Sequence, residues 1–288
     1  FCNSPDQTTL YNDQTDKNFF RKKSINLVYQ ELKYFKNNYG VEYNYFWADT
    51  FLSWNNQEFD EFCEMYSDIK LPFWMQTRPE TLTDYKIKRL AEVGLHRISF
   101  GIEHGNEAFR KKLLKRDWKN GPIIEALKIP VKYGIAFSVN NITGFPTETR
   151  ELAMDTVELN RHIKSNNQNL YSFVPFHGTP LREKCEELGL VEPETITKAL
   201  TDKPMLRQKQ YTPEEIEGLQ KCFVYYVNMP KNRWKDIARA EKNTPEGKRI
   251  FEDLKTEYMD KYMYSQNGSS KGESPNVSDL EYGMEHTN

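Results

Sequence analysis

Acidic side chains stand at the ends of two β-forming segments of the 288-residue chain. Glu103 follows the apolar segment 95–102, and Asp49 follows the segment 41–48, which alternates like a strand. In a barrel of repeated strand and helix units, ligands bind where the strands end. A carboxylate there can accept charge-assisted hydrogen bonds from a ligand. Alternatively, each residue caps the helix or turn that follows, and these stretches alone leave both interpretations open.

Four further polar side chains stand at comparable positions. Gln76 and Arg78 follow the short segment 71–76, and the planar guanidinium of Arg78 would fit either a ligand carboxylate or a surface ion pair. His104 and His177 occupy loops after two other β-forming segments, where a histidine can exchange a proton near neutral pH or simply form hydrogen bonds at the surface. We predict these four as candidate substrate contacts, with both histidines projecting from the strand-end face.

The segments that carry these residues alternate between strand and helix. Alternation and β-forming residues predict strands at 41–48, 71–76, 95–102, 135–142 and 169–174. Helical periodicity predicts helices at 19–38, 55–66, 83–93, 106–133 and 148–163, whereas the polar residues 6–18 are predicted as loop. Glu148 is expected in the first helical turn, where negative charge is favourable. Strands joined by such helices lie parallel, so we expect an α/β fold, a partial open (β/α) barrel whose first strand is missing.

Beyond residue 190 the pattern changes. Prolines interrupt a polar segment, and two helices with charged faces are predicted at 213–227 and 234–262. The tail has few apolar side chains to offset the entropy of ordering, so it is expected to be disordered. The predicted divisions are residues 1–190 for the barrel, 191–264 for a helical extension and 265–288 for the tail.

Charge and cysteine usage restrict the class of protein. Lys and Arg number 40 against 42 Asp and Glu, a net charge of −2, so bulk electrostatics favour neither nucleic acid nor an anionic membrane. Without a spanning apolar run or a signal-peptide pattern, we expect a cytoplasmic protein. The cationic residues within 110–116 are expected to form a solvated face. Three cysteines lie in helical apolar patterns and are predicted as small buried hydrophobic residues: Cys63, Cys185 and Cys222.

Several stretches, taken in order, resemble the radical S-adenosylmethionine enzymes. Cys2, followed by Asn-Ser-Pro, is similar to the last cysteine of the family's Cys-x-x-x-Cys-x-x-Cys loop. Residues 101–107, Gly-Ile-Glu-His-Gly-Asn-Glu, resemble the Gly-Ile-Glu-Ser-Gly segment of a subgroup whose members often carry an upstream cobalamin-binding domain. Residues 144–149 and 175–181 resemble two turns of that subgroup, and Asp49 the acidic residue that closes its second strand.

The resemblance covers roughly residues 1–190 and implies a set of cofactor contacts. Cys2 would be one of three thiolates that hold a [4Fe–4S] cluster, whose fourth iron binds S-adenosylmethionine in this family. Because the chain starts beside this third cysteine, we expect a fragment that is inactive by itself. The family's Gly-Gly-Glu sequence is absent. The remaining implied cofactor contacts are Asp49 to the ammonium group, Glu103 to the ribose hydroxyls, and Asn140, Gly144 and the backbone at Val174 near the adenine.

The implied function is that of a radical enzyme. Its parent would generate a 5′-deoxyadenosyl radical or support methyl transfer on an unknown small-molecule or peptide substrate, with an electron donor such as flavodoxin or ferredoxin and with cobalamin from a domain outside this chain. No nucleic-acid or membrane partner is expected. Two alternatives remain open: a barrel lyase or hydrolase using Asp49 and Glu103 as an acid–base pair, and a non-catalytic module that binds a nucleotide or a partner.

Overall fold

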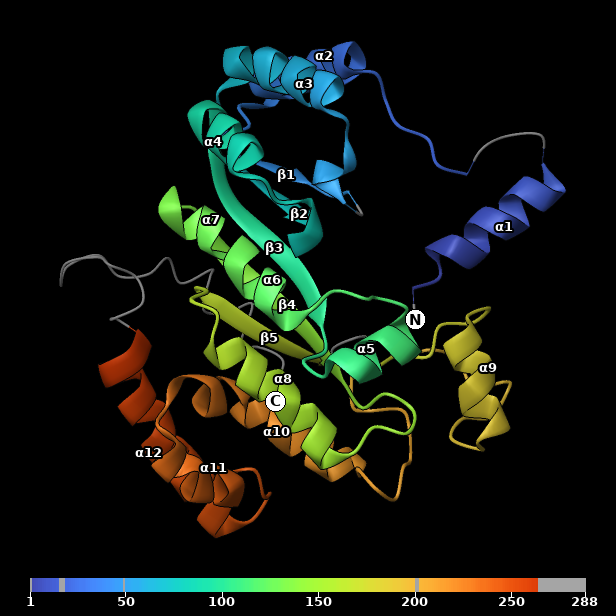
Figure 1. The fold of residues 1–288 in the computed structure, drawn as a ribbon, viewed down its shortest axis with the longest axis vertical. Helices are drawn as coiled ribbons and strands as arrows, with labels where there is room; N and C mark the ends of the chain where they lie inside the picture. Colours follow the sequence, from blue (N-terminus) through green and yellow to red (C-terminus); the bar gives the residue numbers. More distant parts are fainter. Residues whose placement is uncertain (1, 16–18, 49, 200–201, 264–288) are drawn as a thin grey trace. The chain divides into compact units, whose positions relative to one another are not determined.

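The fold is built on one sheet of five strands, seen in the computed structural model of the chain, which describes residues 2–15, 19–48, 50–199 and 202–263 (Figure 1). The strands follow one another in the sheet in sequence order: β1 Asn44–Phe46, β2 Phe73–Thr77, β3 Leu95–Glu103, β4 Ala136–Thr143 and β5 Asn167–Ser172. β1 pairs with β2, and β2 with β3, in parallel. The predicted α/β fold and its five strands are confirmed, with the strand ends displaced by a few residues.

Helices connect the strands, as parallel pairing requires. Those before β3 are α1 Ser4–Gln14, α2 Ile25–Tyr39, α3 Asn56–Ile69 and α4 Asp84–Val93, with the short turns η1 Phe51–Ser53 and η2 Pro79–Thr81. Those between β3 and β5 are α5 Glu107–Leu114, α6 Asn120–Ala126, α7 Lys128–Lys132 and α8 Arg150–Arg161. After β5 come α9 Pro180–Glu187, α10 Pro213–Asn228, η3 Lys231–Arg233, α11 Trp234–Ala240, α12 Pro245–Tyr258 and η4 Met259–Met263. Within the described ranges, no helix has the length and apolar character needed to cross a bilayer.

Three predicted boundaries are wrong for local reasons. The predicted loop 6–18 contains α1, which has a proline in its first turn. The predicted helix 106–133 is three helices, because Lys115 takes a left-handed conformation, φ 57°, and ends α5. The predicted helix 234–262 is interrupted where the Thr244 side chain accepts a hydrogen bond from the Gly247 amide and begins α12. The predicted disordered tail lies outside the described residues.

The chain divides into two compact units. The N-terminal unit comprises Cys2–Ile102 and Trp118–Val139, and the C-terminal unit comprises Glu103–Asp117 and the residues from Asn140 onward. The boundary runs through β3 and β4, so each of these strands begins in one unit and ends in the other. The predicted division at residue 190 stays a prediction.

In the N-terminal unit, one face of the strands is covered by aromatic packing against α3. Phe46 of β1 and Phe73 of β2 contact Tyr66 of α3, with ring centroids 5.8 and 4.8 Å away. Phe62 and Tyr66 point to the same side because they are four residues apart in a helix. Figure 1 shows α2 beside α3 in this unit. Alternate strand residues, among them Tyr45 and Trp74, therefore face the other side of the sheet.

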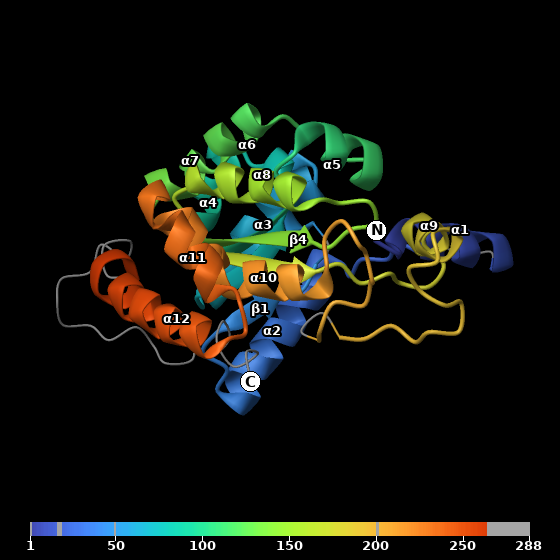
Figure 2. The ribbon, with the colours of Figure 1, turned by 90° about the horizontal axis from the view of Figure 1, so that it is seen from below.

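In the C-terminal unit, α10 packs against β5 and α8. Its first turn is closed by reciprocal hydrogen bonds between Thr212 and Glu215. The apolar side of α10 is fully buried against Ala153 and Val157 of α8, and burying each large side chain contributes roughly 1.5–3 kcal/mol. Figures 1 and 2 show α10, α11 and α12 grouped together. In this unit, α10 therefore covers β5 and α8.

Candidate functional site

Glu103 ends β3 in a strained conformation. Its φ is 72°, in the left-handed region, which costs a non-glycine residue roughly 1–2 kcal/mol. The next residues hold it there: the Gly105 amide donates to Thr156 Oγ1 of α8 at 2.9 Å. A Cβ on Gly105 would lie 2.1 Å from the carbonyl oxygen of Asp155, so only glycine permits this approach. Strain of this kind is found at functional sites when the surrounding structure maintains it.

The Glu103 carboxylate is paired with Arg116. Arg116 Nη1 lies 3.0 Å from Glu103 Oε1, and the two side chains are only 10% and 15% exposed. The alternative that Glu103 caps the following helix is wrong, because Asn106 Oδ1 accepts from the Phe109 amide at 2.8 Å and is the cap. Sequence reasoning missed Arg116, since it had been grouped with the solvated cations within 110–116. No local sequence signal marks Arg116, because the end of α5 at Lys115 was not predicted.

His104 is fully buried rather than open to a ligand. Its Nδ1 accepts the Asn106 amide at 3.1 Å, so the proton is assigned to Nε2, which donates to Glu148 Oε1 at 3.0 Å. The His104 carbonyl accepts from Arg110 Nη1 at 2.5 Å. The expectation that His104 projects from the strand-end face is therefore wrong.

Glu148 closes the turn after β4. Its Oε2 accepts the amides of Gly144 and Phe145 at 2.5 and 2.9 Å, and Oε1 accepts Thr143 Oγ1 at 3.3 Å. The expected position of Glu148 in the first turn of the helix is wrong, because α8 begins at Arg150 with Thr149 as its cap. The carboxylate is fully buried, and its hydrogen bonds replace the lost hydration.

Gly144 is required by this turn. Its φ is 81°, and a Cβ there would lie 2.9 Å from Ile216 Cδ1 of α10. Because its amide is bonded to Glu148, the turn and its packing explain the glycine. A role for Gly144 at the cofactor stays a prediction.

The other predicted residues of the C-terminal unit have local partners. Asn140 Oδ1 on β4 accepts from Asn169 Nδ2 at 2.9 Å. Val174 is buried, and its carbonyl accepts the Phe176 amide at 3.1 Å. His177 is exposed in the turn before α9. These positions leave the predicted roles of Asn140, Val174 and His177 untested.

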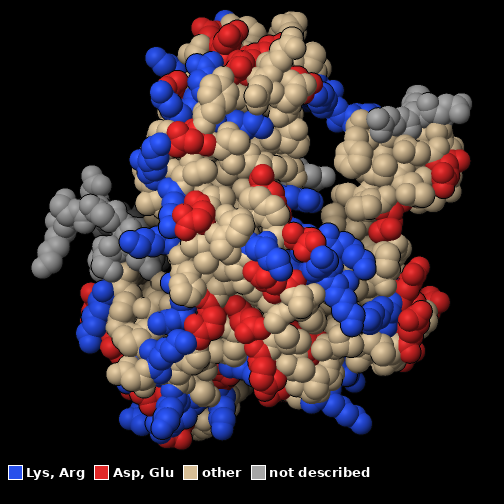
Figure 3. Space-filling model, viewed as in Figure 1, with Lys and Arg blue, Asp and Glu red and all other residues tan. Residues whose placement is uncertain are grey.

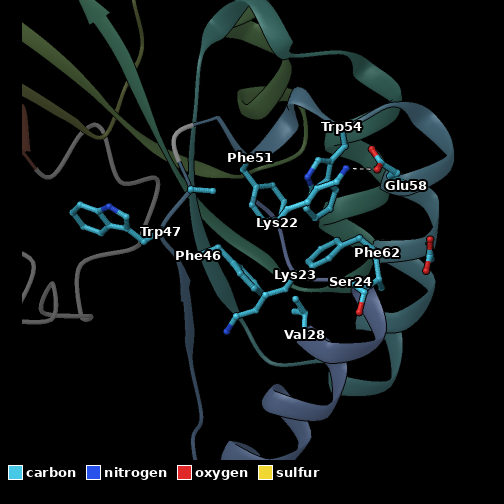
Figure 4. A pocket seen from close by; sticks show the side chains of 13 residues that line it. Lys22, Lys23, Ser24, Val28, Phe46, Trp47, Phe51, Trp54, Glu58 and Phe62 are labelled. Carbon is cyan, nitrogen blue, oxygen red and sulfur yellow. Dashed lines mark hydrogen bonds and ion pairs between the residues drawn. The ribbon is translucent and has the colours of Figure 1, made fainter. Parts of the chain in front are cut away.

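In the N-terminal unit, Gln76 lies on the sheet face that is turned away from α3. Its Nε2 donates to the Tyr45 hydroxyl at 2.7 Å. Arg78 is exposed, and its carbonyl accepts from Thr81 Oγ1 at 2.7 Å. Asp49 lies outside the described residues. Figure 4 shows Trp47 pointing away from Phe46, on the other side of β1.

A pocket of about 310 Å³ opens on the α3 side of β1 (Figure 4). Aromatic and aliphatic side chains form most of its wall, and an ion pair between Lys22 and Glu58 lies at its edge. Its lining residues include Val28, Phe46, Phe51, Trp54 and Phe62. A pocket with this lining suits an apolar group that makes few directional hydrogen bonds.

The surface charges are mixed in sign. In the face seen in Figure 3, Lys and Arg are interspersed with Asp and Glu. Exposed ion pairs of the described residues include Lys111 with Asp117 at 2.6 Å and Lys132 with Asp84 at 2.6 Å. Such exposed pairs contribute little to stability, because solvent and salt screen them.

The cysteines fall into two classes. Cys2 is exposed, whereas Cys63, Cys185 and Cys222 are buried, as predicted. Burial raises the pKa of each of these three thiols to about 12. The described residues contain no group of three side chains that could hold a metal ion. They therefore offer one accessible thiol, which is too few for the three-thiolate arrangement of a [4Fe–4S] cluster.

Several curated relatives align with the chain. It is 26% identical over 220 residues to an uncharacterized methyltransferase of Pyrococcus horikoshii, covering 76% of this chain and 48% of the relative. It is 31% identical over 118 residues to the tRNA-2-methylthio-N(6)-dimethylallyladenosine synthase of Halalkalibacterium halodurans, covering 39% of this chain and 22% of that enzyme. The chain thus spans at most about half the length of these relatives.

Solved structures show the same fold. The cobalamin-dependent radical enzyme OxsB, with aqua-cobalamin and S-adenosylmethionine bound, superposes with a TM-score of 0.54 at 12% identity, covering 86% of this chain and 42% of that one. The methyltransferase TsrM of Kitasatospora setae, with cobalamin and a [4Fe-4S] cluster bound, gives 0.50 at 12% identity, covering 82% and 56%. At this identity the likeness concerns the fold alone.

A family model matches more than half of the chain. The Radical SAM superfamily model covers residues 1–159, which contain all strand ends from β1 to β4. This range includes both Cys2 and the strained Glu103. The chain belongs to the radical S-adenosylmethionine superfamily.

Proposed function

We propose that this chain is the S-adenosylmethionine-binding part of a radical enzyme that generates a 5′-deoxyadenosyl radical or transfers a methyl group. The observation that carries the proposal is the strained, mostly shielded carboxylate of Glu103 at the end of a parallel strand, held by Arg116. In α/β sheets, ligands bind beyond the carboxyl ends of the strands. The fold and family agree with such a site.

A [4Fe–4S] cluster needs three thiolate ligands, and the described residues offer one accessible thiol. Cys2 supplies one accessible thiol, and the buried thiols of Cys63, Cys185 and Cys222 face apolar cores. In this proposal Cys2 is one cluster ligand, and the other two come from outside the described residues. The residues present do not complete the site by themselves.

The donor set at the strand ends fits S-adenosylmethionine. The Glu103 carboxylate can accept hydrogen bonds from the ribose hydroxyls, and Arg116 orients that carboxylate. The amide of Asn140, the turn at Gly144 and the backbone at Val174 are proposed to face the adenine, and Asp49 the ammonium group. When bound, the cofactor supplies the radical or the methyl group, while the chain binds it, orients it and excludes water.

Methyl transfer is supported by the relatives. One is named a methyltransferase, and OxsB and TsrM bind cobalamin. We therefore propose that a cobalamin domain outside these residues takes part, that an electron donor such as flavodoxin or ferredoxin supplies the electron, and that the substrate is a small molecule or a peptide.

The test is S-adenosylmethionine binding by the protein that carries this chain, after anaerobic iron–sulfur reconstitution and measured by calorimetry. Glu103→Gln is expected to lower the affinity about tenfold or more, because a hydrogen bond to a charged group contributes about 1.5–3 kcal/mol. Glu151→Gln, an exposed carboxylate at the start of α8, is the matched control and is expected to change nothing. Equal affinity in both variants would contradict the assignment of Glu103.

A further inference from the structure

We propose that the sheet face of the N-terminal unit opposite α3 binds a planar aromatic heterocycle, and that the substrate of the proposed radical reaction carries such a ring. That this ligand is a substrate rests on the proposed function. That the face binds a planar ring rests on the geometry of Tyr45, Trp47, Trp74 and Gln76 alone.

A cross-strand row forms the centre of this face. Strand register places Tyr45 opposite Trp74, and Trp74 opposite Arg97. The Tyr45 and Trp74 rings are 4.8 Å apart with planes inclined by 32°, and the Arg97 guanidinium lies 5.8 Å from the Trp74 ring. These tilted aromatic and cation–π contacts place Trp74 between Tyr45 and Arg97, so the row is a polarisable surface with the more exposed Tyr45 ring at its end.

The row is accessible at Tyr45, on the side of the strands that is turned away from α3. Phe46 and Phe73, the neighbours of Tyr45 and Trp74 in sequence, pack against α3 on the other side. Tyr45 is 43% exposed, and Trp47, whose ring lies 5.4 Å from that of Tyr45, is 79% exposed. A tryptophan this exposed beside two contacting aromatic rings is the kind of apolar patch that marks a binding surface.

The Trp74 ring is fixed in position. Its Nε1 donates to Ser99 Oγ at 3.0 Å, and Ser99 Oγ lies 2.9 Å from Ser138 Oγ on β4. Both serines are buried, so the chain of hydrogen bonds holds the indole in one orientation. The fixed indole supports the neighbouring Tyr45 ring, and a rigid surface loses little conformational freedom when a ligand binds to it, which favours binding.

Polar atoms at the edge of the row select a heterocycle over a hydrocarbon. Gln76 donates to the Tyr45 hydroxyl through Nε2, and its Oε1 has no hydrogen-bond partner within the described ranges. The Trp47 side chain is 79% exposed, so its indole N–H is open to a ligand acceptor. One acceptor and one donor therefore border the aromatic surface. A planar ring with both a donor and an acceptor on its edge matches this arrangement.

The pocket on the α3 side of β1 is the competing receptor. It is also lined by aromatic rings, but it would accept any apolar group of suitable size. Trp54 lines this pocket and Trp74 does not, so the two tryptophans provide a matched pair of variants (Figure 4).

The experiment measures the fluorescence anisotropy of acridone, a planar heterocycle with an N–H and a carbonyl, mixed with the purified 288-residue chain. Trp74→Leu is expected to weaken acridone binding about tenfold or more, within the range known for loss of one stacking residue. Tyr45→Leu, at an exposed position that keeps the fold, is expected to weaken it in the same direction. Trp54→Leu is expected to leave the affinity unchanged. Benzimidazole is expected to compete and cyclohexanone not to compete.

Other results would overturn the inference. These are absence of acridone binding, retention of binding in both Trp74→Leu and Tyr45→Leu, loss of binding in Trp54→Leu alone, or equal competition by cyclohexanone. Circular dichroism of each variant checks folding. Glu103→Gln is expected to keep acridone affinity. If this variant also kept its full S-adenosylmethionine affinity, the proposed function would be contradicted, whereas the ring site would still be supported by the acridone measurements.

Discussion

The buried ring of His104 donates a hydrogen bond to the buried carboxylate of Glu148 across 3.0 Å. The bond joins the turn after β3 to the turn after β4 within the C-terminal unit. Glu103 immediately precedes His104, and Gly144 donates its amide to the same carboxylate. The pair therefore positions two of the predicted cofactor residues without facing a ligand itself.

Glu148→Gln is expected to lower the free energy of unfolding by about 2–4 kcal/mol, measured by urea titration. The amide group of glutamine offers one acceptor instead of two, so buried donors among Gly144, Phe145 and His104 lose their partner. Glu151→Gln makes the same chemical change at an exposed position and is expected to stay within about 0.5 kcal/mol of the parent chain. Similar losses in the two variants would show that the buried network is not the cause.

Gly105→Ala is expected to destabilise the chain by at least about 2 kcal/mol. The new Cβ would meet the backbone of α8 at Asp155 and Thr156, which cannot move aside as a flexible side chain would. Gly121→Ala serves as the control, because nothing lies within 4 Å of a Cβ there and α6 favours alanine. Its stability is expected to be unchanged or higher. An equally stable Gly105→Ala chain would mean that the turn after β3 does not contact α8 this closely.

The cysteines are expected to react very differently with a thiol reagent. Burial raises the pKa of Cys63 from 9.0 to about 12, which lowers its thiolate fraction about a thousandfold. The native chain is therefore expected to show one fast-reacting thiol, Cys2, and the urea-unfolded chain all four. Cys2→Ala is expected to remove the fast phase. A fast phase that survives in Cys2→Ala would show that Cys63, Cys185 or Cys222 is accessible to the reagent, which contradicts their burial in the structure.

Alkaline pH is expected to destabilise the chain. Burial raises the pKa of Tyr66 from 10.0 to about 12, and raises the pKa of four tyrosines in the C-terminal unit as well: Tyr211, Tyr225, Tyr226 and Tyr258. Between the unfolded and folded pKa values the unfolded chain releases protons that the folded chain keeps. Each such group then removes up to about 1.4 kcal/mol of stability per pH unit above about pH 10.

Urea titrations above and below pH 10 and the phenolate absorbance test this expectation. The buried phenolates are expected to appear only with unfolding, and Tyr66→Phe is expected to flatten the fall in stability. Phenolate absorbance that reaches its full value while the chain remains folded would contradict the burial of these rings.

Local patterns predicted the elements well where propensity and packing agree. Segment 95–102 combines β-formers with an ending at Glu103, and it is a strand in the structure. The apolar spacing in 55–66 placed α3 correctly, and Cys63 is buried in its packed face. Helix breaks were harder: Lys115 has no residue-type signal for a left-handed conformation, although its amide and that of Arg116 both donate back to the Arg110 carbonyl and end the helix.

The sequence predicted some residues of the candidate site, but it did not predict which of them contact each other. Glu103 lies at a strand end as expected, but its pairing with Arg116 was hidden in a run of cations. His104 and Glu148 are 44 residues apart, so no local pattern could show that they contact each other. The ring row of Tyr45 and Trp74 depends on strand register, which sequence alternation does not determine.

Cluster assembly in the protein that carries this chain tests the central claim most directly. After anaerobic reconstitution, iron content and 5′-deoxyadenosine formation are measured for the parent protein, for Cys2→Ala and for Cys63→Ala. The account predicts that Cys2→Ala loses the cluster and forms no 5′-deoxyadenosine, whereas Cys63→Ala loads iron like the parent. Equal iron loading and equal product in both variants would contradict the assignment of Cys2 as a cluster ligand and, with it, the radical function.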